Sequence, residues 1–205
     1  MNLREPAHCA VRIETGDLEG GTGRYQKRLS DLAGLYADEA AFNERLAREA
    51  DRVVYEVGEF RPNSAEGDLI FGVTRMEPGR IGREFFLTRG HIHRKADRPE
   101  IYYGETGRGV MLMESPDGET RTVEIGPKSV CYVPPYWIHR SVNVGEDQLV
   151  MLFCYPADAG QDYDIIARSG GMRHRVVTDG AGGWRLEENG EWRPRSAEAL
   201  AALSG

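Results

Sequence analysis

The sequence predicts an all-β protein of the barrel or sandwich type. Its 205 residues include 25 glycines and 10 prolines, and this density of turn formers favours many short strands over a helix bundle. Beyond residue 52 the chain breaks into short runs rich in apolar and β-branched residues, which turn-forming residues separate. Eight such runs at close spacing are typical of a β-sandwich or β-barrel.

The elements can be assigned in chain order. Residues 1–25 predict an extended arm with loose turns, and residues 38–50 carry the one long helical pattern, with Asp38 as its N-cap. The eight strands are expected at residues 53–57, 69–76, 84–88, 109–114, 120–125, 129–133, 138–144 and 148–155. A helical turn at 165–168, a closing hairpin from 176–178 and 184–188, and a weakly helical tail at 196–203 complete the chain.

The length and the absence of a linker pattern favour one domain, since single domains commonly hold ~150 residues. We expect a single domain over residues 1–205. It would consist of an N-terminal arm and helix (1–52), a barrel with closing strands (53–192) and a tail (193–205).

Charge and hydropathy exclude several classes of partner. The net charge is −7, from 26 basic and 33 acidic residues, so nucleic acid and anionic membranes are poor partners. The longest apolar stretch, 149–155, is far shorter than the ~20 residues that span a bilayer. Residues 1–17 lack the apolar segment of a secretory signal, and the expected location is the cytoplasm.

Three of the five histidines, with one glutamate, form a candidate metal site. His91 and His93 are two residues apart in an extended segment, so both imidazoles project from one face. Glu100 opens a strand over 100–102, and His139 opens another. Three imidazoles and one carboxylate suit Fe, Mn, Ni, Co or Zn and leave positions open for a substrate. An isolated His-x-His pair is more often structural, but Glu100 and His139 at this spacing favour one divalent transition metal ion.

At these residues the chain resembles the cupin superfamily. His91, His93, Glu100 and Gly107 match the first cupin motif, Gly-x5-His-x-His-x(3,4 or more)-Glu-x6-Gly, with Phe85 in place of its first glycine. Pro134, His139 and Asn143 match the second motif, Gly-x5-Pro-x-Gly-x2-His-x3-Asn, with Lys128 and Tyr136 in place of its two glycines. The resemblance implies a cupin-type β-barrel or jelly roll with a flanking N-terminal arm and helix, and His91, His93, Glu100 and His139 as metal ligands.

More specific strings resemble the cupin-type phosphoglucose isomerases. They are Phe-Gly-Val-Thr at 71–74, Thr-Arg-Gly-His-Ile-His at 88–93, Pro-Pro-Tyr-Trp-Ile-His at 134–139 and Tyr-Pro-Ala-Asp-Ala-Gly at 155–160. The resemblance runs from about residue 53 to the turn at 189–190. It implies interconversion of glucose 6-phosphate and fructose 6-phosphate, with iron as the first choice of metal. It also implies a homodimer, for which the arm before residue 25 is the segment expected to cover the partner.

The same resemblance assigns roles within the site. Glu100 is the expected base for proton transfer between C1 and C2, and the metal would polarise the sugar oxygens as a Lewis acid. A direct hydride shift is the competing mechanism. The residues expected to bind substrate are Thr74, Thr88, Gly90, Tyr102, Tyr155 and Tyr163. Gln161 is a departure, because family members often carry histidine there, and an amide cannot take part in proton transfer.

Two other functions fit parts of the pattern. Three histidines and a glutamate also suit an oxygenase that uses Fe(II) and O2, although the expected phosphate donors argue against it. A sugar-binding cupin without turnover is the third hypothesis, favoured only by Gln161. Cys131 and Cys154 lie in apolar strands, and we expect them to be small core residues.

Overall fold

The computed structural model describes residues 3–12, 15–49 and 51–203. The predicted helix end at Ala50, parts of the predicted arm (1–2 and 13–14) and the end of the tail (204–205) lie outside the described residues. Within the described part, no helix has both the length and the apolar character needed to cross a membrane.

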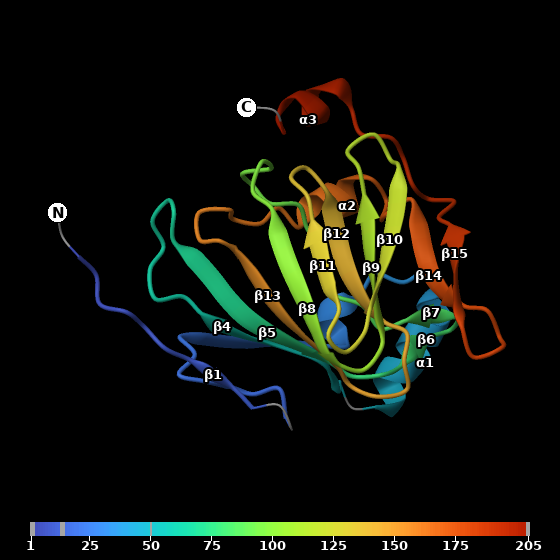
Figure 1. The fold of residues 1–205 in the computed structure, drawn as a ribbon. Coiled ribbons are helices and arrows are strands. Elements are labelled where there is room, and N and C mark those ends of the chain that lie inside the picture. Colours follow the sequence, from blue (N-terminus) through green and yellow to red (C-terminus); the bar gives the residue numbers. More distant parts are fainter. Residues whose placement is uncertain (1–2, 13–14, 50, 204–205) are drawn as a thin grey trace.

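The all-β prediction is confirmed, and the sheets are antiparallel throughout. The larger sheet has six strands in the order β11-β8-β13-β5-β4-β3 (Figure 1). They are Val130–Val133, Glu100–Thr106, Leu149–Pro156, Leu69–Met76, Val53–Phe60 and Gly23–Arg28. The smaller sheet, β10-β9-β12, comprises Thr120–Ile125, Gly109–Glu114 and Ile138–Asn143.

The two sheets form a jelly roll whose edges are not closed by a continuous ladder. Buried side chains of both sheets belong to one apolar core, which includes Met111 and Leu112 from β9 and Met151 and Phe153 from β13. Isolated bridges, not strand ladders, connect residues 87 and 91 to β12. One of these bridges pairs the motif histidines His91 and His139.

Three further groups of elements flank the roll. A four-stranded sheet, β15-β14-β7-β6, comprises Trp184–Glu188, His174–Thr178, Glu84–Phe85 and Arg80–Ile81. A two-stranded ladder joins β1 (Ala10–Val11) to β2 (Leu18–Glu19). The helical elements are η1 (Ser30–Leu32), α1 (Glu39–Arg48), α2 (Asp164–Arg168) and α3 (Ala197–Ala201).

Several strand bounds match the prediction, and the differences follow tertiary pairing. Strands β5, β9 and β10 have the predicted bounds. The strand expected at 84–88 ends at Phe85, because the following residues leave the β6–β14 sheet to form isolated bridges with β12. The strand expected at 100–102 continues to Thr106, since β11 and β13 pair with it on both sides.

The N-terminal segment is more ordered than the predicted arm with loose turns. Its last part, β3, pairs with the edge of β4 over six register positions, from Gly23↔Glu59 to Arg28↔Val53. This pairing satisfies backbone groups that an exposed edge strand would leave open, which local sequence patterns do not reveal. The helix prediction is confirmed: the Asp38 carboxylate accepts from the Ala41 N–H at 2.9 Å and caps α1, whose Phe42 is buried.

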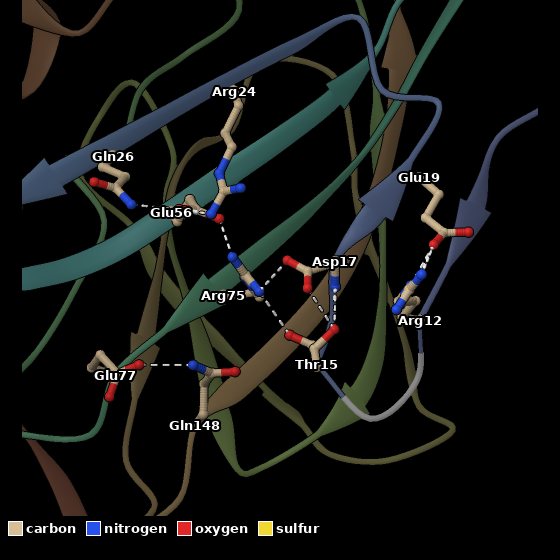
Figure 2. A network of polar contacts seen from close by, with 10 residues as sticks. All are labelled: Arg12, Thr15, Asp17, Glu19, Arg24, Gln26, Glu56, Arg75, Glu77 and Gln148. Atoms are coloured by element: carbon tan, nitrogen blue, oxygen red, sulfur yellow. Dashed lines mark hydrogen bonds and ion pairs between the residues drawn. The ribbon is translucent and has the colours of Figure 1, made fainter.

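Arg75 on β5 ties the N-terminal segment to the large sheet (Figure 2). Its guanidinium donates to the Asp17 carboxylate at 2.6 Å and to the Thr15 carbonyl at 2.9 Å, and it also pairs with Glu56. Glu56 is buried on β4 and accepts from Arg24 and Gln26 on β3, each at 2.6 Å. One buried carboxylate therefore links β3, β4 and β5, and the segment around residue 17 packs on its own chain.

A second buried carboxylate anchors the C-terminal tail. Glu114, the last residue of β9, is fully buried and accepts from Arg195 at 2.6 Å and from the Trp192 indole at 3.2 Å. The backbone N–H of Arg173 donates to its other oxygen at 2.5 Å. The Arg195 side chain is itself only 3% exposed, so both charges depend on this pairing.

We expect Glu114→Gln to lower the free energy of unfolding by about 3 kcal/mol, because it leaves the buried Arg195 cation without its counter-charge. Equilibrium unfolding in urea measures the change. The matched control is Glu119→Gln, which removes a surface partner of Arg121 and should change stability by less than about 1 kcal/mol. Equal losses in the two variants would contradict the anchoring role of Glu114.

Candidate metal centre and adjoining pocket

An antiparallel bridge places two of the candidate ligands side by side. The His91 N–H donates to the His139 carbonyl at 3.0 Å, and the His139 N–H donates back to His91 at 2.9 Å. Directly opposed residues of an antiparallel pair project their side chains to the same face, and the two imidazole centroids are 4.5 Å apart. His93, two residues after His91, projects to that face as well.

Glu100 completes the cluster from the first position of β8. Its Oε2 atom lies 3.0 Å from Nε2 of His139, 3.2 Å from Nε2 of His93 and 3.8 Å from Nε2 of His91. One ligand atom from each of the four residues lies within 4.8 Å of every other, and all four side chains are buried. The structure therefore brings together the four residues that the spacing of the motifs selects.

Two backbone carbonyls orient the imidazoles. Nδ1 of His93 lies 2.7 Å from the Arg98 carbonyl, and Nδ1 of His139 lies 3.0 Å from the Trp137 carbonyl. A carbonyl accepts only from N–H, so these contacts hold the proton on Nδ1 and turn Nε2 toward Glu100. This is the arrangement in which an imidazole offers the Nε2 lone pair to a metal ion.

Burial and the neighbouring charges set the protonation of the cluster. Burial, followed by the charge of His139, holds the pKa of His91 well below its ordinary value, so His91 is neutral. Burial opposes the charged form of His93, but the Glu100 carboxylate outweighs it and raises the His93 pKa. Burial also opposes ionisation of Glu100, yet the histidines lower its pKa far below the ordinary range.

The donor set fits a divalent transition ion. The Nε2 atoms of His91 and His93 are buried without a hydrogen-bond partner, an expensive condition unless a further group engages them. They converge with His139 on an ionised carboxylate, and three imidazoles plus one carboxylate match the preferences of such ions. The residues can thus hold a metal, and their chemistry does not by itself select which one.

A cavity adjoins the cluster inside the roll. All six residues expected to bind substrate line it, together with His91 and Glu100. Other side chains that line it are Tyr25, Tyr55, Val57, Glu59, Arg89, Ser141, Phe153 and Gln161. Its volume is about 50 Å³, and the partly exposed Tyr25 is among the residues that line it.

Neutral hydrogen-bonding groups form part of the lining of this cavity. The Thr88 hydroxyl lies 3.3 Å from the Ser141 hydroxyl and accepts from the Ser141 N–H at 3.1 Å. The Arg89 N–H donates to the Tyr55 hydroxyl at 3.4 Å, and burial raises the pKa of Tyr55 to about 12. Thr74 lines the same cavity from β5. Such a cluster of neutral donors and acceptors can bind a phosphate when several converge.

Gly90 occupies a position where no side chain fits. Its φ is +73°, and a Cβ added there would lie 2.8 Å from the side chains of Arg140 and Ile166. The absence of a side chain lets the backbone between Thr88 and His91 pass close to β12 and face the cavity. A replacement at Gly90 would therefore disturb both the cavity and the bridge to His139.

Aromatic side chains also line the cavity. Burial, then the charge of Glu100, raises the pKa values of Tyr102 and Tyr155, so both phenols remain neutral donors. Tyr163 donates to the side chain of Gln161, and the Arg89 guanidinium lies over its ring at 5.1 Å. Gln161 thus lies at the cavity and positions a tyrosine by hydrogen bonding.

The comparison with protein families identifies the chain. The glucose-6-phosphate isomerase (GPI) family matches residues 26–193, which include both motifs and every residue of the cluster. The chain belongs to this family. The match begins within β3, well before residue 53, where the resemblance seen in the sequence strings starts.

Curated relatives extend over almost the whole chain. A protein named "Putative glucose-6-phosphate isomerase 1" of Rhizobium meliloti (strain 1021) is 64% identical over 203 residues, 99% of this chain and 95% of that protein. The glucose-6-phosphate isomerase of Thermococcus kodakarensis (strain ATCC BAA-918 / JCM 12380 / KOD1) is 44% identical over 193 residues, 94% of this chain and all of that protein. Among solved structures, recombinant oxalate oxidase with glycolate superposes with a TM-score of 0.45 at 14% identity, over 53% of this chain and 54% of that one, too low to support an argument.

Several cavity residues were missed by the sequence analysis. Ser141 lies two positions after His139 on β12, so strand periodicity places it on the same face and was a sufficient signal. Tyr55 and Val57 alternate on β4 and face the cavity together. Tyr25 had no local signal, because it reaches the cavity only through the pairing of β3 with β4.

We expect metal binding at neutral pH to release protons, with His93 as the main source. Its raised pKa keeps part of the population protonated near pH 7, whereas a metal ligand must be neutral. Metal affinity should therefore fall as the pH drops through the His93 pKa. Calorimetric titration in two buffers with different ionisation enthalpies measures the released protons. His174→Ala, a change outside the cluster, should leave the proton release unchanged, and a release unaffected by His93→Ala would contradict this assignment.

Proposed function

We propose that this protein is a metal-dependent aldose–ketose isomerase that interconverts glucose 6-phosphate and fructose 6-phosphate. The observation that carries the proposal is the convergence of a buried three-histidine, one-glutamate cluster and a set of neutral donors on one cavity. Membership of the glucose-6-phosphate isomerase family supports it. The chemistry requires a hydrogen to move between C1 and C2 while negative charge develops on the sugar oxygens.

Glu100 is the proposed base. Its carboxylate is buried and ionised, and it is the one acidic group that both belongs to the cluster and lines the cavity next to His91. Because the Glu100 carboxylate is buried, water does not compete for it. The neighbouring phenol of Tyr102 can hold a sugar hydroxyl in line with the carboxylate. A divalent ion bound by the four residues would supply Lewis-acid stabilisation of the developing oxygen charge.

The phosphate is proposed to lie between Thr74, Thr88 and the Gly90 backbone. These groups line the cavity together with Tyr55 and Ser141, whose hydroxyls contact the Arg89 N–H and the Thr88 hydroxyl. The Arg89 guanidinium, which lies over the Tyr163 ring, adds one positive charge to the cavity lining. Tyr155 and Tyr163 then line the sugar portion, where neutral phenols donate to hydroxyl oxygens. Iron is our first choice among divalent transition metals, and the cytoplasm is the proposed location.

We expect fructose 6-phosphate turnover, read by coupled oxidation of glucose 6-phosphate, to vanish when metal is stripped and to return with Fe(II), Mn(II), Ni(II) or Zn(II). Glu100→Gln should lose at least about 100-fold in kcat, the usual contribution of a positioned base. The bound metal is measured in the same samples to separate loss of the base from loss of the ion. His174→Ala is the control and should retain turnover. Metal binding without turnover under all four ions would contradict the isomerase assignment and favour oxygenase or sugar-sensing activity.

We expect Thr88→Val to raise KM for fructose 6-phosphate about tenfold, because one hydrogen bond to a charged group is lost at nearly unchanged volume. The change should leave kcat within about threefold, since the phosphate lies away from C1 and C2. Competition by inorganic phosphate provides a direct test, and its inhibition constant should rise in parallel. A fall in kcat with an unchanged KM would place Thr88 at the reacting end of the sugar instead.

The protein is also proposed to be a homodimer. The arm around residue 17 packs on its own sheet, whereas the outer face of β8 and β11 exposes apolar side chains in register. Ile101, Val130 and Tyr132 are 45%, 61% and 53% exposed, and contiguous apolar surface of this kind favours protein contacts. A second copy of the chain is the proposed partner for this face. The dimer contact would then involve β8 and β11 and not the N-terminal arm alone.

We expect gel filtration with light scattering to give a dimer mass, and Tyr132→Lys to shift the protein toward the monomer by placing a charge within the apolar face. Lys27→Glu, a charge change on β3 away from this face, is the matched control and should remain dimeric. A wild-type monomer would refute the dimer, and a dimer unaffected by Tyr132→Lys would move the contact to another surface.

A further inference from the structure

A second cavity lies against the face of β12 that points away from the metal cluster. Strand residues alternate between faces, so Arg140 projects opposite to His139 and Ser141. The cavity has a volume of about 180 Å³, room for about six water molecules. Residues that line it come from β7, β9, β12, α2, β14 and the loops beside them, among them Leu35, Glu84, Arg140, Ala167, Met172 and Arg175.

Arg140 is a buried cation that forms no ion pair with any of the residues that the structure describes. The residue is only 6% exposed, and one Nη atom of its guanidinium donates to the Arg89 carbonyl at 2.6 Å. Its Nε atom is buried and has no hydrogen-bond partner. Among residues 3–12, 15–49 and 51–203, no carboxylate oxygen lies within 4.0 Å of this guanidinium. A buried charge left in this state is strongly unfavourable unless a ligand or an ion engages it.

The other charged groups of the cavity do not satisfy Arg140. Glu84 is buried, but it accepts from Arg175 at 3.0 Å and from the Ala37 N–H at 2.6 Å, so it serves a different cation. Arg175 also donates to the side chain of Asn189 and to the Leu35 carbonyl. Glu191 lines the cavity but is exposed to solvent. The buried Arg140 and the partly buried Arg175 therefore face one buried carboxylate, Glu84, which leaves an excess of one positive charge among these three side chains.

We propose that this cavity binds a small oxyanion, a phosphate or carboxylate group, which pairs with Arg140. Arg140 lines this cavity, and its guanidinium can donate charge-assisted hydrogen bonds to such a group. The polar wall also includes Arg175, while Leu35, Leu87 and Met172 provide an apolar side for the remainder of a small ligand. This site is distinct from the sugar cavity, because β12 separates the two.

The Arg140 side chain connects the two cavities. Its donation to the Arg89 carbonyl holds the residue that precedes Gly90, and its Cβ packs against Gly90. An anion that changes the position of Arg140 therefore acts on the backbone proposed to face the sugar phosphate. By thermodynamic reciprocity, the anion and the sugar phosphate then change each other's affinity by the same factor.

Calorimetric titration of the metal-loaded protein with inorganic phosphate, and separately with acetate, tests the site. Both titrations are run with saturating fructose 6-phosphate, which occupies the sugar cavity. We expect at least one of the two anions to bind under these conditions, with one site per chain. Binding of phosphate alone identifies a phosphoryl ligand, and binding of acetate identifies a carboxylate ligand.

Two variants locate the bound anion. Arg140→Lys keeps the charge but loses the paired N–H donors, and should weaken binding about tenfold. Ala167→Phe lies on the exposed side of α2 and fills the mouth of the cavity without touching the buried cation, so it should abolish binding even if Arg140→Lys fails to fold. Thr88→Val should weaken only the binding of phosphate in the first cavity, from which fructose 6-phosphate displaces it. The proposal would be overturned if neither anion binds in the presence of saturating fructose 6-phosphate. It would also be overturned if Ala167→Phe binds the anion as tightly as the wild type. Neither result depends on turnover.

Discussion

The antiparallel bridge between His91 and His139 is the contact on which the site depends. It pairs a segment that has left the flanking sheet with the first residues of β12, and thereby places two imidazoles on one face. Glu100 reaches the same point because β8 begins there, paired with Val133 of β11. Three separate chain segments thus bring their ends to one buried point, where Nε2 atoms without partners and an ionised carboxylate face each other.

Much of this arrangement could be predicted because it rests on short-range rules. Strand periodicity placed His91 and His93 on one face, and turn chemistry separated the strands whose ends carry Glu100 and His139. The N-cap at Asp38 and the bounds of β5, β9 and β10 are likewise local features. The substrate could be predicted only from the resemblance to a known family. No spacing rule distinguishes a threonine that binds phosphate from one that simply favours a strand.

The features that escaped prediction depend on partners distant in the sequence. Lys128 and Tyr136 replace motif glycines, yet both keep the left-handed conformation, with φ of +66° and +71°. Such residues are disfavoured by about 1–2 kcal/mol, and backbone bonds to Gly104 and Ala96 hold them in place. The pairing of β3 with β4, which brings Tyr25 to the cavity, is equally non-local. These contacts follow from the assembled roll.

The alternation of β12 explains why one strand serves two cavities of opposite character. His139 and Ser141 face the inside of the roll, where hydroxyls and imidazoles line the first cavity. The protein has a net charge of −7, and few cationic side chains line this cavity. Arg140, between them, carries its charge to the other face, where no carboxylate of the described residues forms an ion pair with it. Burial lowers its pKa to about 10, which leaves it charged at neutral pH. The strand thus separates a cavity lined by neutral donors from a cavity lined by the Arg140 cation, and the Arg140–Arg89 hydrogen bond connects the two linings.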